Sequence, residues 1–144
     1  NGSPNSNSIG RSAKVCKEEI AGLITALELF VDTDHQVIVD EWRAKCAYIV
    51  DSIDNIPGVI AHLGEAQPEL DEFPLTQPRA TISFDKSWTG PNKERVEELL
   101  ESGEPSIRVR SVGSPRHITI SPTNLIDGDE VIIARRIREI LIQK

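Results

Sequence analysis

The sequence has few cysteines, no excess of basic residues and no long apolar run. With only Cys16 and Cys46 among 144 residues, it indicates neither a disulfide scaffold nor a cysteine-rich zinc site. The formal net charge of −7 repels phosphate backbones, which argues against nucleic acid as a main partner. No apolar run approaches the roughly 18 residues that a membrane helix requires, and no secretory signal peptide is recognisable. We therefore expect a reducing, cytoplasmic setting and no membrane partner.

What is present is the composition of an ordinary globular domain. Hydrophobic residues make up 38% of the chain and charged residues 27%, both normal for a soluble fold. A globule of this length buries roughly two thirds of the surface that its unfolded chain exposes. One domain with a real hydrophobic core is therefore expected.

Two long helices are predicted first. From Lys17 the apolar residues recur at helical spacing, with Glu18 and Glu19 in the first turn, where acidic side chains favour the helix dipole. A second helix is predicted over residues 38–53, and it ends before Pro57-Gly58. Before the first helix, residues 1–8 are turn formers without periodicity, which predicts an extended loop.

Four strands are predicted after these helices. Residues 59–63 form a short apolar run, and residues 79–84 alternate cleanly between apolar and polar side chains. Residues 107–112 and 117–121 also alternate, and the four residues between them suit a hairpin turn. The last two strands are therefore expected to pair antiparallel.

Two further helices complete the pattern. Pro91 suits the first turn of a short helix and Gly103 the position after its end. Asp127 and Glu130 resemble a capping box ahead of a terminal helix. The element order predicts an α/β (α+β) fold, with an antiparallel or mixed sheet of about four strands and helices packed on one face.

The most specific motif is Ile9–Leu23, IGRSAKVCKEEIAGL. It resembles a signature of the selenocysteine-synthase-like group of fold-type-I enzymes dependent on pyridoxal phosphate (PLP), a group that includes L-seryl-tRNA selenium transferase and D-glucosaminate-6-phosphate ammonia-lyase. Family members often have glycine in place of Cys16 and a bulkier residue in place of Ala13. Neither difference removes a charged group.

The resemblance implies that the chain is the carboxy-terminal part of such an enzyme. Residues 1–16 would be a linker from a missing large domain, and residues 17–144 a small domain that includes the interdomain helix. PLP would be bound by a lysine of the missing portion, because no strand precedes Lys14 or Lys17 here. The resemblance also implies a homo-oligomer.

Arg11, Lys14 and Lys17 form the sharpest candidate site. Three cations near a helix start, together with free backbone N–H donors, suit an anion such as a phosphate. By resemblance, Arg11 and Lys14 match basic residues that face the active site. The alternative is that all three pair with nearby acidic residues such as Glu18 and Glu19. Cys16, at the expected N-cap, is either a reactive thiolate or an inert thiol.

Thr119 is the other candidate for substrate binding. In many fold-type-I enzymes an arginine on a small-domain strand binds the substrate carboxylate, and Thr119 stands in the matching place. Arg108, Arg110 or Arg116 could replace that arginine, or each could be an ordinary surface residue. His117 is a candidate for a catalytic role, but a lone histidine at the start of a strand is usually structural. His35 and His62 show no partner pattern, so no metal site is predicted.

The sequence therefore predicts part of a PLP-dependent lyase or transferase that acts on a small phosphorylated, amino-acid-like substrate by ammonia-lyase or β-elimination chemistry. This segment alone would be inactive. The acidic charge favours a sugar-acid phosphate over a tRNA-bound substrate. Two alternatives remain: an independent module that binds an anion without catalysis, and a dimerisation domain.

Overall fold

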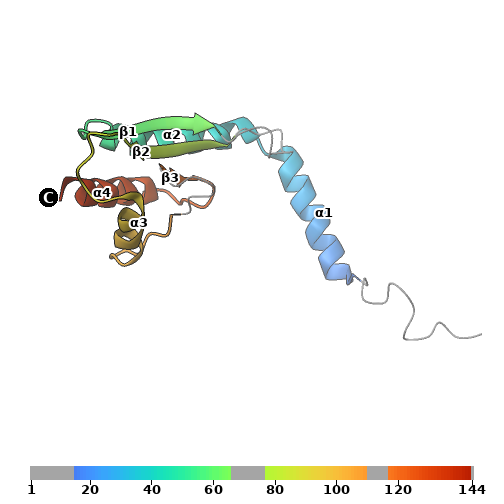
Figure 1. Cartoon of the computed structure of the whole chain (residues 1–144). Helices are drawn as coiled ribbons and strands as arrows, with labels where there is room; N and C mark the ends of the chain where they lie inside the picture. The colour runs from blue at the N-terminus through green and yellow to red at the C-terminus, as the bar shows by residue number, and fades with distance from the viewer. Residues whose placement is uncertain (1–14, 66–76, 110–116, 144) are drawn as a thin grey trace, which may run out of the picture. The chain divides into compact units, whose positions relative to one another are not determined.

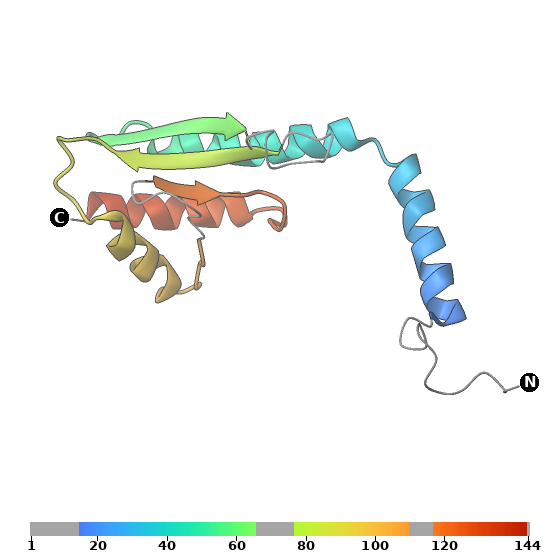
Figure 2. The same ribbon diagram turned by 45° about the vertical axis from the view of Figure 1, so that its right-hand side comes forward.

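The computed structural model describes residues 15–65, 77–109 and 117–143. It divides into an N-terminal unit, Asn1–Asp34, and a main unit, His35–Lys144. The described part of the N-terminal unit is built around helix α1 (Lys17–Asp32). All other helices and strands belong to the main unit (Figures 1 and 2).

Helix α1 begins where the sequence predicts. Its N-cap is Cys16, and Glu18 and Glu19 occupy the first turn. None of its residues is buried, although Ile20, Leu23 and Leu27 form part of an apolar stripe along it and are 48%, 62% and 54% exposed. Within the described residues, no helix combines the length and the apolar character needed to cross a bilayer.

The described residues of the main unit form a three-stranded antiparallel sheet and three helices. In chain order these are α2 (His35–Ile53), β1 (Val59–Glu65), β2 (Pro78–Phe84), α3 (Lys93–Glu101), β3 (His117–Ile120) and α4 (Asp129–Ile142). The strand order is β1-β2-β3, with Ala61 opposite Ile82 and Ile82 opposite Ile118. Figures 1 and 2 show α2 and α4 running behind the strands.

The core lies between the sheet and helices α2 and α4. Each strand alternates between a buried and a less buried residue, as the two-residue period of a strand requires. The fully buried side chains include Ile82 and Ile118 from the sheet, Ile49 from α2 and Ile137 from α4. Val96 and Leu100 of α3 join the same cluster, so all three helices are held by one apolar core.

Two basic side chains tie the helices to distant parts of the chain. Lys45 of α2 donates from Nζ to the Leu125 carbonyl at 3.0 Å and contacts Asp127 Oδ1 at 2.9 Å. Arg138 of α4 donates from Nη1 to the Ser52 carbonyl and to Asn55 Oδ1, both at 2.8 Å. The first pair of contacts holds the segment before α4 against α2, and the second holds the end of α2 against α4.

The predicted fold class is confirmed, with two local corrections. The sheet has three described strands rather than about four, because residues 107–109 form no strand and the rest of the predicted strand 107–112 lies outside the described residues. The Ile107 N–H bonds instead to the Leu100 carbonyl at the end of α3, at 2.9 Å. Helix α4 begins at Asp129 after an N-cap at Gly128, so Asp127 is free to pair with Lys45.

We predict that Gly58→Ala destabilises the main unit. Gly58 has φ +83°, and a Cβ there would lie 2.9 Å from the Trp88 Cα, a backbone atom that cannot move aside. The expected loss in free energy of unfolding is about 1–3 kcal/mol, measured by urea denaturation. Gly64→Ala is the control, because its nearest contact would be an ordinary 3.6 Å. Equal losses in the two variants would contradict the prediction.

Candidate functional site

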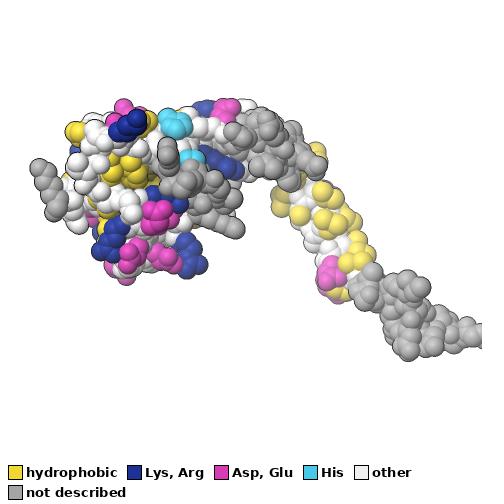
Figure 3. All heavy atoms as spheres, in the orientation of Figure 1, with side chains coloured by type: hydrophobic (Ala, Val, Ile, Leu, Met, Phe, Trp, Pro, Cys, Tyr) yellow, Lys and Arg dark blue, Asp and Glu magenta, His cyan; other side chains and the backbone are white. Residues whose placement is uncertain are grey.

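The side of the sheet turned away from α2 and α4 is the main candidate site. We call it the open face and define it by its hydrogen-bonding side chains: His62, Arg79, Thr81, Ser83, His117 and Thr119. None of them is buried. They alternate along the strands with the buried residues of the core. Figure 3, which looks onto the strands, shows histidine side chains (cyan) on the visible surface.

Thr119 lies on β3, at one edge of the open face. It is opposite Thr81 of β2, which is itself opposite His62 of β1. Directly opposite residues in an antiparallel sheet have Cβ atoms about 4.5–5.5 Å apart, so the three side chains form a row across the sheet. His117 is opposite Ser83 in the adjacent row. The structure therefore brings Thr119 and His117 onto one surface.

The start of α1 differs from the expected arrangement of free donors. The Cys16 N–H donates to Glu19 Oε2 at 2.9 Å. Hydrogen bonds from the Glu18 backbone and from the Cys16 side chain lower the pKa of Glu18. The helix's own carboxylates thus occupy donors that an anion would need. Lys17 is exposed at this position, and Arg11 and Lys14 lie outside the described residues.

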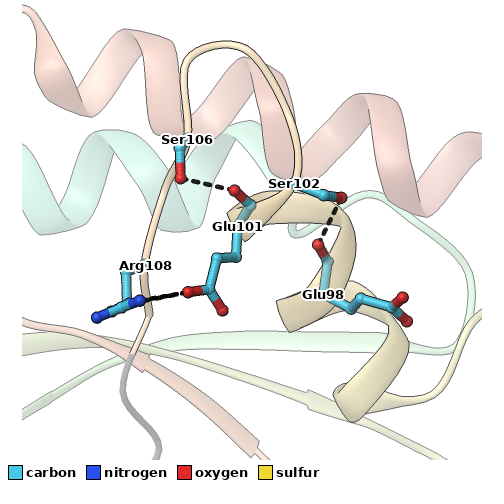
Figure 4. A network of polar contacts seen from close by, with 5 residues as sticks. All are labelled: Glu98, Glu101, Ser102, Ser106 and Arg108. Carbon is cyan, nitrogen blue, oxygen red and sulfur yellow. Dashed lines mark hydrogen bonds and ion pairs between the residues drawn. The ribbon is translucent and has the colours of Figure 1, made fainter.

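The arginines considered as substitutes for a carboxylate-binding residue are engaged or undescribed. Arg108 donates from Nε to Glu101 Oε1 at 3.0 Å, in a network at the end of α3 (Figure 4). In the same network, Ser106 Oγ donates to the Glu101 carbonyl at 2.6 Å. The Glu101 carboxylate neutralises the charge of Arg108, so Arg108 is poorly suited to bind a substrate anion. Arg110 and Arg116 lie outside the described residues.

Two surface hollows adjoin Trp88. One of about 500 Å³ is lined by Phe84, Lys86 and Lys93 among others, and the other, of about 530 Å³, by Ile56, Pro57 and Leu141 among others. The Trp88 ring stacks on Phe84 with centroids 5.1 Å apart, and its Nε1 donates to the Pro91 carbonyl at 2.8 Å. Since the indole donor is already satisfied, Trp88 serves packing.

None of the described lysines suits a Schiff base with PLP. Lys45 is held by Asp127 and the Leu125 carbonyl, and hydrogen bonding to Asp127 raises its pKa, which favours the charged form over the nucleophilic amine. Lys93 pairs with Glu97 at 3.5 Å. Lys17 and Lys86 are exposed. These residues do not form a site for the cofactor.

The two cysteines differ in their surroundings. Cys16 is exposed and Cys46 is buried. Burial raises the pKa of the Cys46 thiol to about 11, so this thiol stays protonated at neutral pH. Its Sγ lies 3.8 Å from the Pro78 carbonyl in the core. Cys46 is therefore a packing residue.

Comparison with known proteins gives consistent results. The chain is 29% identical over 133 residues to D-glucosaminate-6-phosphate ammonia lyase of Salmonella typhimurium, covering 92% of this chain and 34% of the relative. The structure of a D-glucosaminate-6-phosphate ammonia-lyase matches with a TM-score of 0.64 and 26% identity, covering 94% of this chain and 35% of that one. The resemblance to this group is confirmed.

A second relative carries out a different reaction. It is the 5'-C-glycyluridine monooxygenase-decarboxylase of a Streptomyces species, 24% identical over 135 residues, which are 93% of this chain and 33% of that protein. No protein-family model matches the chain. The chain spans about a third of the length of these relatives.

His62 and Thr81 are the site residues that the sequence did not reveal. Thr81 stands at an ordinary polar position of an alternating strand, and His62 lies within the short apolar run of residues 59–63. Their proximity to Thr119 depends on the strand order and register, which local periodicity does not specify. The one available signal was the alternation itself, which already placed Thr81 and Thr119 on the polar side of their strands.

We predict that the two thiols differ in reactivity. At pH 8 on the order of one Cys46 thiol in a thousand is ionised, given the raised pKa, and burial also blocks the reagent. Iodoacetamide should therefore label Cys16 in the native protein and leave Cys46 unmodified until urea is added, as measured by mass spectrometry of peptides. The prediction is wrong if both cysteines are labelled at equal rates under native conditions.

Proposed function

We propose that this chain is the C-terminal part of a PLP-dependent lyase that acts on a phosphorylated amino-sugar acid of the D-glucosaminate 6-phosphate type. The observation that carries the proposal is the agreement of sequence and fold, since an ammonia-lyase of this specificity matches 92–94% of the chain in both comparisons. Both similarities extend far beyond the motif at residues 9–23.

The proposed division of roles follows from the lysines that the structure describes. The described lysines do not fit the cofactor, so PLP would be held by the remainder of the parent protein, where it would stabilise negative charge at the carbon next to the amine. Arg11, Lys14 and Lys17 would bind the substrate phosphate. Thr119 would contact the substrate from the open face. No residue of this chain is assigned a catalytic role.

The apolar surface of α1 supports its role as an interdomain helix. A helix that is apolar around much of its circumference is normally buried, and an isolated helix of this length is marginal in water. Besides Ile20, Leu23 and Leu27, the residues Leu29 and Phe30 are 65% and 54% exposed. We propose that the large domain of the parent protein covers this surface. A homo-oligomer would supply a second neighbour for the helix.

The phosphate role is tested by Arg11→Ala in the full-length parent protein. Losing a charge-assisted hydrogen bond costs about 1.5–3 kcal/mol, so the Michaelis constant for D-glucosaminate 6-phosphate should rise about tenfold or more. The constant for unphosphorylated D-glucosaminate should change little. Ammonia release measures both.

The control for Arg11→Ala is Arg95→Ala, because Arg95 is an exposed arginine of α3 whose Nη1 pairs with Glu98 Oε2 at 2.8 Å. It should leave both constants unchanged. Equal effects of Arg11→Ala on the two substrates would refute the phosphate role. Absence of ammonia release by the unmodified enzyme would refute the proposed reaction.

The interdomain role is tested by Leu27→Asp in the same protein. A carboxylate placed in a buried apolar contact should lower the thermal midpoint by roughly 5 °C or more and reduce the soluble yield. Thr25→Asp is the matched control. It introduces the same charge into the same helix, but Thr25 lies away from the stripe that contains Leu23 and Leu27. Differential scanning fluorimetry compares the two. Equal midpoints would show that α1 stays in solvent.

A further inference from the structure

The open face has almost no charge. Across the strands, the outward positions hold Ile60, His62, Gly64, Arg79, Thr81, Ser83, His117 and Thr119. Arg79 is the one charged residue among them. The exposed positions of α3, by contrast, carry an arginine and three glutamates. A sheet face built only to meet solvent normally carries lysine and glutamate as well, so this face has the composition of a surface that contacts something polar and uncharged.

The central row of the open face has unused hydrogen-bonding capacity. The side chains of His62, Thr81 and Thr119 form no hydrogen bond with another residue in the described part of the chain, whereas Ser83 Oγ donates to the Ile60 carbonyl at 3.3 Å. Thr81 and Thr119 are half-buried, so part of their solvation has already been lost. A threonine hydroxyl and a neutral imidazole each offer one donor and at least one acceptor.

We propose that the row His62–Thr81–Thr119 binds hydroxyl groups of the substrate's carbon chain. Hydroxyl groups also donate and accept together, so they match these three side chains, whereas an anion requires donors or cations alone. A linear sugar acid presents several hydroxyls in sequence, as the row presents several partners. The inference rests on the proposed function and adds the determinant that selects a polyhydroxylated chain over a plain amino acid.

Arg79 is the charged neighbour of this row. It stands opposite Gly64, next along β2 from the row on the open face, and its buried Nε has no hydrogen-bond partner within the described residues. Gly64 adds no side chain beside it. The cation therefore lies in the adjacent row, next to Thr81 along β2.

The experiment uses Thr81→Val and Thr119→Val in the full-length enzyme, singly and together. Valine keeps the shape of threonine and removes the hydroxyl. Each single change should raise the Michaelis constant for D-glucosaminate 6-phosphate about five- to tenfold, with little change in kcat. The same comparison is made with analogues that lack the C4 or the C5 hydroxyl. For at least one variant and one analogue, the Michaelis constant should then exceed that of the unmodified enzyme by no more than twofold.

The matched control is Thr89→Val, at an exposed threonine that belongs to no strand, which should leave the Michaelis constant unchanged. Calorimetric binding of D-gluconate 6-phosphate, which lacks the amine and does not react, gives a second readout. Its dissociation constant should rise in parallel with the Michaelis constant. Urea unfolding of each variant shows whether the fold is retained.

The outcomes separate this inference from the proposed function. If the unmodified enzyme releases ammonia but both strand variants leave the Michaelis and dissociation constants unchanged, the row does not bind substrate and this inference alone fails. An equal loss with every deoxy analogue would also overturn it, because the row would then support packing. If the unmodified enzyme does not turn over D-glucosaminate 6-phosphate, the proposed function fails and the inference fails with it.

Discussion

The burial of one side of the three-stranded sheet under α2 and α4 is the constraint on which the rest of the main unit depends. Ile82 and Ile118 of the sheet and Ile49 and Ile137 of the helices are fully buried together. Because side chains alternate along a strand, the same packing directs Thr81 and Thr119 to the opposite side. A register slip of one residue would exchange the two sets. Core and open face are thus two consequences of one alternation.

Most of the fold could be predicted because its signals are local. The apolar spacing in α2 and α4 and the alternation in β2 each arise within a few turns or residues. The predicted strand at residues 107–112 shows the limit. Ile107 and Val109 alternate with polar residues because both pack partly against the core. A strand also needs a neighbouring strand for its backbone hydrogen bonds, and the Ile107 N–H donates instead to the Leu100 carbonyl at the end of helix α3.

The candidate site could be predicted only in part, for a related reason. A cluster of basic residues close together in sequence is visible without a structure, and so is the position of Thr119 in an alternating strand. The row formed with His62 and Thr81 is not, because it joins three strands separated by a helix and long connections. The carboxylates that occupy the start of α1 were visible as residues, but their hydrogen bonds to the backbone depend on side-chain conformation.

Most cations of the main unit are already paired, and this bears on where the phosphate and the hydroxyl groups of a substrate would bind. Among its described cations, all but Arg79 and Lys86 contact a carboxylate, a carbonyl or an amide oxygen, as Arg43 does with Glu65 and Arg108 with Glu101. Such exposed pairs add little stability, but each cancels positive potential that would attract a phosphate. The main unit is therefore better suited to neutral hydrogen bonding than to binding a dianion. Under the proposed function, the phosphate then falls to the basic residues before α1 and to the rest of the parent protein, and the hydroxyl-bearing chain falls to the open face.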